Sequence, residues 1–182
     1  MKKEQSGLGN HIYTEWLFPV KDYYCSIRKN EAVFEIAIPF FCATICSALY
    51  FFANKVFLAL DGLSNLLPTA ISILIGFTVM LITLLLTSTG ENVDKLKNTQ
   101  TDKVLYGRKV SLYQGLHIQF SHSLFSEIVL LLTTFVYLFW NGLGMPVAAG
   151  VIFLVVEIHL TLNILLSILR GITSLYFSFY RS

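Results

Sequence analysis

The chain has 182 residues, of which 55% are hydrophobic and only 13% are charged, and its formal net charge at pH 7 is +2. Soluble domains usually carry about 25% charged residues, so about half of the usual solvating charge is missing. A disordered chain would combine low hydrophobicity with high net charge, and a typical nucleic-acid binder would be strongly basic. The composition excludes both classes and indicates an integral membrane protein.

The gaps between charged residues predict four membrane-spanning helices. Long stretches without Asp, Glu, Lys or Arg separate Glu35 from Lys55, Asp61 from Glu91, and Glu127 from Glu157. A helix needs about 20 residues to cross the hydrocarbon core, and the predicted spans are about 33–54, 67–88, 120–141 and 147–169. The apolar runs are continuous, which favours helices over the alternating strands of a barrel. We therefore expect an all-α integral membrane protein built from two helical hairpins.

The positions of the basic residues predict the orientation of these hairpins. With both termini inside, 12 of the 13 Lys and Arg residues lie on the inner side and only Lys55 lies outside. Short inner loops are enriched in Lys and Arg, and the opposite orientation would invert that ratio. The sequence therefore predicts an N-in, C-in topology, and we read no secretory signal peptide at its start.

Three water-facing segments are expected: an arm (residues 1–32), a loop (89–119) and a short tail (170–182). The arm is rich in aromatic residues, namely Tyr13, Trp16, Phe18, Tyr23 and Tyr24. Because Trp and Tyr favour the headgroup level, the arm is interpreted as an interfacial anchor, with a docking strip for a partner as the alternative.

The loop is longer than two packed helices need, and long loops are often functional. Ser88 and Glu91 have the spacing of a capping box, which predicts a short helix from about Glu91 to Lys97, followed by a polar turn. Basic residues of the loop could bind a partner protein or anionic lipid; they are Lys95, Lys97, Lys103, Arg108 and Lys109. We assign them to partner binding.

Several polar residues fall at membrane depth. Glu35 and Glu127 are interpreted as boundary residues, whereas Glu157 lies near the middle of the fourth span, where a charge is costly. His159 and Asn163 share one helix face, nearly opposite to Glu157. These residues indicate either an ion or proton pathway or hydrogen bonds between helices.

Small residues predict where helices approach closely. Ser72 and Gly76 form a small-xxx-small pair in the second span, and Gly150 lies on a similar surface of the fourth. Both surfaces suit close packing of a neighbouring helix.

Motifs for enzymatic chemistry are missing from the sequence, which contains no P-loop, dinucleotide-binding glycine pattern, zinc-protease motif or nucleophile elbow. His117 and His122 are five residues apart and do not share a helix face, so we predict no metal site there. Cys25, Cys42 and Cys46 are interpreted as free cysteines rather than as a disulfide framework. We expect no enzyme activity, cofactor or direct binding of nucleic acid.

The stretch from Leu74 to Ser88, continuing through Glu91 to Lys97, resembles small membrane proteins of bacterial anti-phage operons. The layout of arm, hairpins and middle loop resembles the four-span membrane subunit of the Kiwa defence system. That resemblance implies a multi-pass protein of the bacterial inner membrane that serves a separate cytosolic, DNA-associated effector. It implies no catalytic residues.

Two functional hypotheses follow from the sequence. In the first, the protein is a homo-oligomeric inner-membrane sensor or scaffold that recruits a cytosolic effector for anti-phage defence. In the second, it is a small oligomeric ion channel or proton-coupled transporter that uses Glu157, with His159 and Asn163 beside the pathway.

Overall fold

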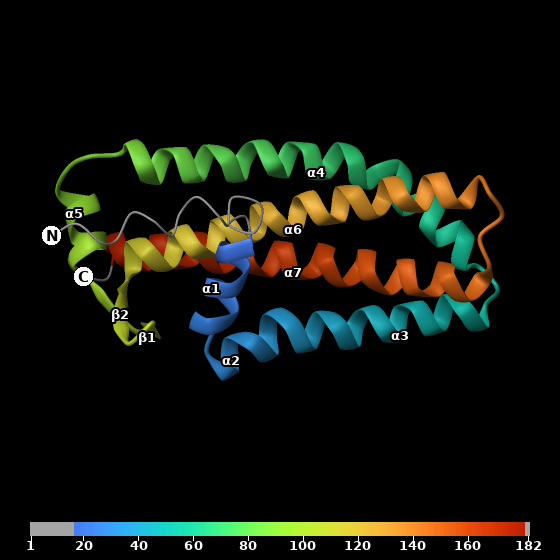
Figure 1. The fold of residues 1–182 in the computed structure, drawn as a ribbon, viewed down its shortest axis with the longest axis horizontal. Helices are drawn as coiled ribbons and strands as arrows, with labels where there is room; N and C mark the ends of the chain where they lie inside the picture. Colours follow the sequence, from blue (N-terminus) through green and yellow to red (C-terminus); the bar gives the residue numbers. More distant parts are fainter. Residues whose placement is uncertain (1–16, 181–182) are drawn as a thin grey trace, which may run out of the picture.

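The computed structural model describes residues 17–180 and is dominated by four long helical segments (Figure 1). The first consists of α2 (Lys29–Ala32), the π-helical turn η3 (Val33–Ala37) and α3 (Ile38–Phe52). The others are α4 (Val56–Thr87), α6 (Leu112–Asn141) and α7 (Val147–Tyr180). All four are long and apolar enough to cross a membrane. The predicted all-α membrane fold with four spanning helices is confirmed.

Helices α6 and α7 run antiparallel through the middle of the bundle, with α4 packed mainly on α6 and α3 mainly on α7 (Figure 1). Three clusters of buried apolar side chains fill the bundle along its length; they centre on Leu60 and Leu154, on Ile71 and Ile164, and on Leu116 and Phe120. Large apolar side chains such as Phe41, Ile73 and Phe139 stand exposed on the outer faces. Apolar outer faces of this kind are suited to contact with the acyl chains of lipids.

Three of the predicted spans are shorter than the helices that contain them. Helix α6 begins at Leu112 rather than near residue 120, so residues 112–119 of the predicted loop are helical. Helix α4 begins at Val56 rather than near residue 67, and it contains Pro68. A proline lacks the N–H of a helical hydrogen bond, but membrane helices tolerate it. Helix α7 continues through Tyr180, so the segment predicted as a tail is helical as far as the structure describes it.

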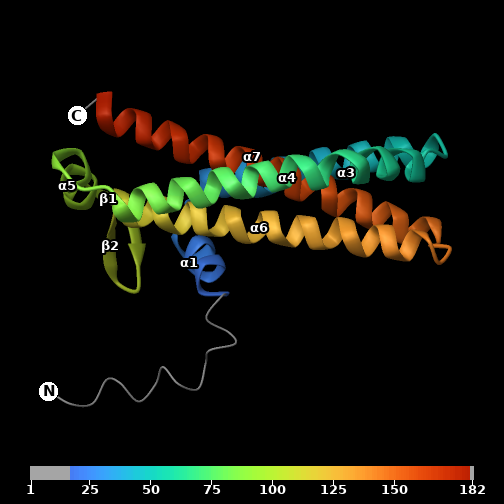
Figure 2. The same ribbon diagram turned by 90° about the horizontal axis from the view of Figure 1, so that it is seen from above.

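The chain between α4 and α6 is a compact structure rather than an open loop (Figure 2). It contains α5 (Glu91–Asn98) and the antiparallel strands β1 (Gln100–Leu105) and β2 (Arg108–Ser111). The predicted helix is confirmed, but its predicted capping box is wrong. Gly90 is the N-cap residue, with φ of 122° and no side-chain cap bond. That φ favours glycine.

The hairpin was not predicted. Leu105 pairs with Arg108, and the two residues between them, Tyr106 and Gly107, both have positive φ. Positive φ at both positions matches the right-handed twist of the strands, as in a type I′ turn. A capping box does form at the next helix, where Ser111 and Gln114 cap α6 through reciprocal hydrogen bonds.

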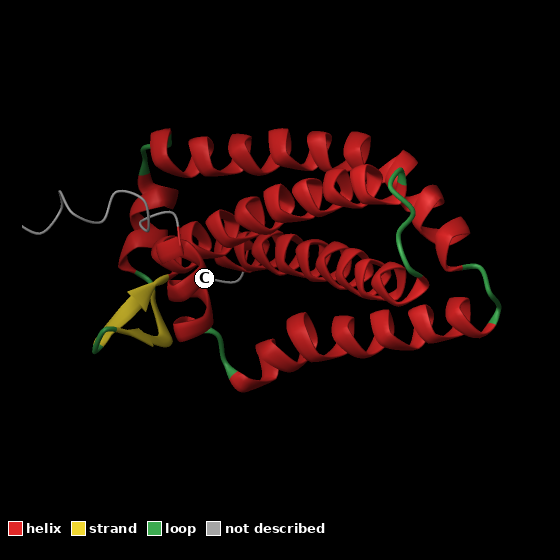
Figure 3. Ribbon diagram, turned by 45° about the vertical axis from the view of Figure 1, so that its right-hand side comes forward, coloured by secondary structure: helices red, strands yellow, loops and turns green. Residues whose placement is uncertain are grey.

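Secondary structure outside the bundle gathers at one end (Figure 3). Helix α1 (Phe18–Ser26) packs on α6 and β1 there, beside the hairpin and α5. At the other end the helices are joined by residues 53–55 and 142–146 only. We call the assembly of α1, α5, β1 and β2 the polar end.

Candidate functional site: a buried polar network

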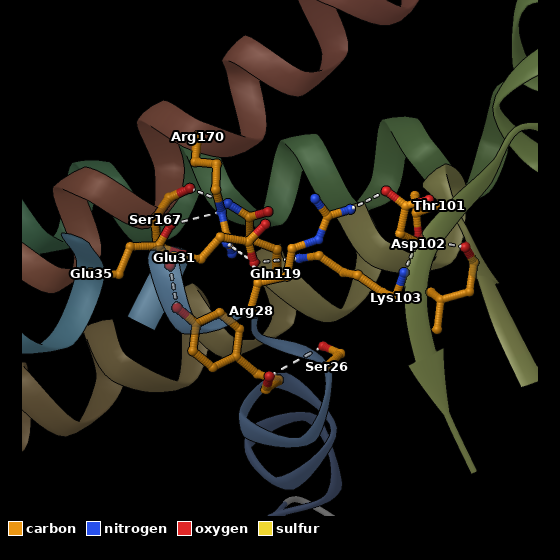
Figure 4. A network of polar contacts seen from close by, with 12 residues as sticks. Ser26, Arg28, Glu31, Glu35, Thr101, Asp102, Lys103, Gln119, Ser167 and Arg170 are labelled. Atoms are coloured by element: carbon orange, nitrogen blue, oxygen red, sulfur yellow. Dashed lines mark hydrogen bonds and ion pairs between the residues drawn. The ribbon is translucent and has the colours of Figure 1, made fainter. Parts of the chain in front are cut away.

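Arg170 of α7 lies between two carboxylates at the polar end (Figure 4). Its Nη1 is 2.7 Å from Oε2 of Glu31, and its Nε is 2.7 Å from Oε1 of Glu35. Lys103 of β1 approaches the same Glu31 oxygen, with its Nζ at 2.8 Å. Two anions thus face two cations in a mostly buried cluster, which balances their charge. We call these four residues the ion-pair cluster.

Tyr23 connects α1 to the ion-pair cluster. Its hydroxyl donates a hydrogen bond to Glu35, and its ring stacks on His122 of α6 with centroids 3.7 Å apart. Burial raises the pKa of the Tyr23 phenol above its ordinary value, and the hydrogen bond to Glu35 raises it further. The phenol therefore stays protonated at neutral pH and remains a donor. His122 is itself buried.

The ammonium group of Lys103 is mostly buried and therefore largely removed from water. Burial lowers the pKa of its ammonium group, and the hydrogen bond to Glu31 opposes that effect. This residue was assigned to partner binding, but its side chain is only 16% exposed and already paired. It therefore holds the hairpin against α2 rather than presenting a charge to a partner.

Asn163 supplies a hydrogen bond that the backbone of the first span lacks. Pro39 has no N–H to donate to the carbonyl of Glu35, four residues earlier in the helix. The Asn163 side-chain amide donates to that carbonyl at 2.5 Å. Asn163 thus forms a hydrogen bond between two helices, which is one of the two roles that the sequence suggested for it; the other was a place beside an ion or proton pathway. The π-helical turn η3 lies at the same point, and such turns often occur at functional sites.

A line of buried polar side chains continues from the ion-pair cluster through the bundle. We call it the polar seam; its members are Gln119, Ser123, Ser126, Glu127 and Thr134 of α6, Glu157, Asn163 and Ser167 of α7, and Thr78 of α4. Gln119 donates to the Ser167 carbonyl, and the hydroxyls of Ser123 and Ser167 are 3.2 Å apart. At the far end Tyr137 donates to Asp61 at 2.7 Å.

The polar seam and Tyr137 together are long enough to cross the hydrocarbon core. From Gln119 to Tyr137 is 18 residues of α6, or about 27 Å of helix. That length is close to the hydrocarbon thickness of about 30 Å. The α6 members recur at helical spacing, so the sequence contains a signal for this polar stripe. Considered one at a time, its residues did not predict the stripe.

Two carboxyl groups of the seam lack full hydrogen bonding. Thr78 donates to Oε1 of Glu127 at 2.7 Å, but Oε2 of Glu127 and both oxygens of Glu157 have no hydrogen-bond partner among the described residues. Both residues are fully buried, so Glu127 is not the boundary residue that the sequence suggested. A carboxylate at this depth is costly unless it is protonated, hydrated or paired.

The other predicted loop cations remain on the surface. Lys95 is exposed and 3.5 Å from Glu91, one turn away, and the Lys97 ammonium lies 5.4 Å from the Tyr113 ring centroid. Arg108 and Lys109 are exposed on β2. These four side chains are accessible to a ligand or a partner, unlike Lys103.

The remaining predicted residues stand outside the network. His159 is half-buried, with its ring 6.0 Å from that of Phe40. Ser72 and Gly76 are exposed, and the Ser72 hydroxyl donates to its own helix at Pro68. A Cβ built on Gly76 meets nothing within 4 Å. No helix in the described part of the chain therefore packs on this pair.

Close packing occurs at other glycines. A Cβ on Gly150 would lie 3.3 Å from Val56 of α4, and one on Gly171 would lie 2.6 Å from Phe120 of α6. The approach at Gly150 agrees with the prediction for that surface.

Within residues 17–180, no group of three or more His, Cys, Asp or Glu side chains could hold a metal ion. Cys25, Cys42 and Cys46 are free and exposed.

Two arrangements can therefore carry function: the rigid polar end, with its exposed cations, and the polar seam. Comparison of the chain with protein-family models, curated proteins and solved structures gave no match.

Proposed function

We propose that the protein is a sensor or scaffold subunit of the bacterial inner membrane that oligomerises and recruits a cytosolic effector, as in the anti-phage systems it resembles. One observation carries this proposal. Among the described residues, the secondary structure outside the bundle is concentrated at one end, where Lys103 of β1 pairs with Glu31 of α2, which in turn pairs with Arg170 of α7. A rigid platform of this kind suits docking of a soluble protein.

The distribution of charge supports the orientation that the proposal needs. The polar end carries the basic residues of α1, α2, α5 and the hairpin, whereas Lys55 is the cation at the opposite end of the described chain. Under the positive-inside rule the polar end is cytoplasmic, which gives the N-in, C-in topology. The basic residues Lys2, Lys3 and Arg181, and the arm residues Tyr13 and Trp16, lie outside the described residues.

Helix α5 offers the docking surface. It anchors itself through the buried Leu96 and turns Lys95 and Lys97 outward. Its position is fixed, so a partner with an acidic surface would not have to order it on binding. Contact between copies of the chain is assigned to the exposed face of α4 around Ser72 and Gly76.

Charge reversal on α5 tests the docking surface. We expect Lys95→Glu with Lys97→Glu to remove a stoichiometric cytosolic protein that co-purifies with the wild-type chain in mild detergent. The reason is that α5 also carries Glu91 and Asp94, so the two substitutions change its net charge from 0 to −4 and should repel an acidic partner that contacts Lys95 and Lys97. The measurement is the mass of the complex purified from native expression.

Lys55→Glu, at the other end of the bundle, is the control and should retain the partner at wild-type yield. If the α5 double variant keeps the partner, the docking surface is wrong. If the wild type elutes without any soluble partner, the recruiting function itself is wrong.

The polar seam favours a second candidate function, that of a small oligomeric ion channel or proton-coupled transporter. Glu127 and Glu157 are buried carboxyls with unpaired oxygens, and intramembrane carboxyls often belong to ion or proton pathways. Glu157→Gln keeps the shape of the side chain and removes its titrating proton. We expect proton flux into liposomes to fall to the level of protein-free vesicles in this variant, whereas Glu91→Gln on the exposed face of α5 leaves it unchanged. Flux that survives Glu157→Gln would exclude Glu157 from a pathway.

A further inference from the structure

A hollow of about 470 Å³ lies where the hairpin meets the first turns of α6. The hairpin contributes the basic residues Arg108 and Lys109 to its lining, and α6 contributes Tyr113 and His117. Apolar side chains line it as well: Leu105, Val110 and Ile118. It thus offers a polar part and an apolar part to one ligand.

The charge in this hollow is uncompensated. No carboxylate lines it, and neither Arg108 nor Lys109 forms an ion pair with a described residue. Two cations beside one space are suited to a phosphate group.

The hollow lies at the level of lipid headgroups. From Glu35 to Lys55 is 20 residues, or about 30 Å of helix, which matches the hydrocarbon thickness. The Glu35–Arg170 ion pair therefore marks one hydrocarbon boundary, and Gln119 contacts α7 one turn inside Arg170. Residues 113–118 of α6, which line the hollow, lie just outside that boundary.

The size and lining of the hollow distinguish a lipid from a free anion. Its volume equals that of about 15 water molecules in the liquid, more than one phosphate fills. The aliphatic side chains suit the glycerol and upper acyl carbons, while the cations suit the phosphate.

We propose that this hollow binds the headgroup of an anionic phospholipid of the leaflet at the polar end, with its phosphate held by Arg108 and Lys109. The inference does not rest on the proposed function. It leaves Lys95 and Lys97 of α5 to a protein partner and assigns the two β2 cations to lipid.

Native mass spectrometry of the full chain in detergent, titrated with phosphatidylglycerol, tests this proposal. We expect Arg108→Ala with Lys109→Ala to weaken binding of phosphatidylglycerol by about thirtyfold, from the usual contribution of two basic residues near an anionic surface. The matched control is Lys21→Ala with Lys29→Ala, which removes the same charge from exposed positions of α1 and α2 and should bind like the wild type. Arg108→Lys with Lys109→Arg keeps the charge and should retain binding.

Three outcomes would overturn the proposal. The first is equal binding of phosphatidylglycerol by the wild type and the alanine double variant. The second is equal affinity for phosphatidylcholine, because the site would then not recognise an anionic headgroup. The third is displacement of the lipid by millimolar inorganic phosphate, which would make the ligand a soluble phosphate. Circular dichroism is the control for folding. Because both substituted side chains are exposed, the helical content of the variants should match that of the wild type.

Discussion

Replacement of Arg170 by leucine is expected to lower the free energy of unfolding by about 3–5 kcal/mol. Arg170 contacts both Glu31 and Glu35 at 2.7 Å, and the Glu35 side chain is only 4% exposed. Removing the guanidinium leaves a buried carboxylate without its cation, and breaking a buried pair on one side costs far more than the pair contributes. The measurement is reversible unfolding in mixed micelles, followed by circular dichroism.

The chain contains a matched control for this effect. Arg28 also pairs with a carboxylate, at 3.1 Å from Asp102, but the two side chains are 48% and 91% exposed. Arg28→Ala should therefore cost less than about 1 kcal/mol, as exposed pairs do.

A rescue experiment identifies the cause of the loss. Adding Glu35→Gln to Arg170→Leu removes the uncompensated charge, because Glu31 still pairs with Lys103, and should recover part of the stability. A loss under about 1 kcal/mol for Arg170→Leu alone would show that the ion-pair cluster does not hold the polar end to the bundle.

The spanning helices could be predicted because their signal is local. Each predicted span is a long apolar run with at most one charged residue, and the thickness of the hydrocarbon core sets its length. The boundaries were less predictable, since Pro68 lies inside α4 and the helix is nevertheless continuous through it. Apolar length thus indicates a span, but it does not show where the helix leaves the membrane.

The hairpin and the ion-pair cluster were not predictable in the same way. The turn uses Tyr106 and Gly107 in place of the Asn-Gly or Asp-Gly pairs that usually indicate it. The ion-pair cluster joins Glu31, Glu35, Lys103 and Arg170, which come from separate segments of the chain. Considered one segment at a time, Glu35 was interpreted as a boundary residue and Lys103 as a loop cation. Lys103 is paired with Glu31 and mostly buried, and these tertiary contacts are not revealed by its neighbours in the sequence.

Substitution of Gly171 by alanine is expected to lower the free energy of unfolding by about 3 kcal/mol, at the upper end of the usual range for overpacking. An added Cβ would lie 2.6 Å from Cε1 and 2.8 Å from Cζ of Phe120. Phe120 is fully buried in the cluster at the polar end, so its ring has little room to move. The strain should push α7 away from α6 beside Arg170 and so loosen the ion-pair cluster as well.

Gly76→Ala is the matched control, since a Cβ there meets nothing within 4 Å. In a helix, alanine is favoured over glycine by up to about 1 kcal/mol, so this variant should be neutral or slightly more stable. Phe120→Leu combined with Gly171→Ala shortens the ring that obstructs the new methyl group and should recover part of the loss, so the two substitutions should be non-additive. Unfolding of all variants is compared in the same micelles. If Gly171→Ala is as harmless as Gly76→Ala, α6 and α7 do not approach each other as closely as the structure requires.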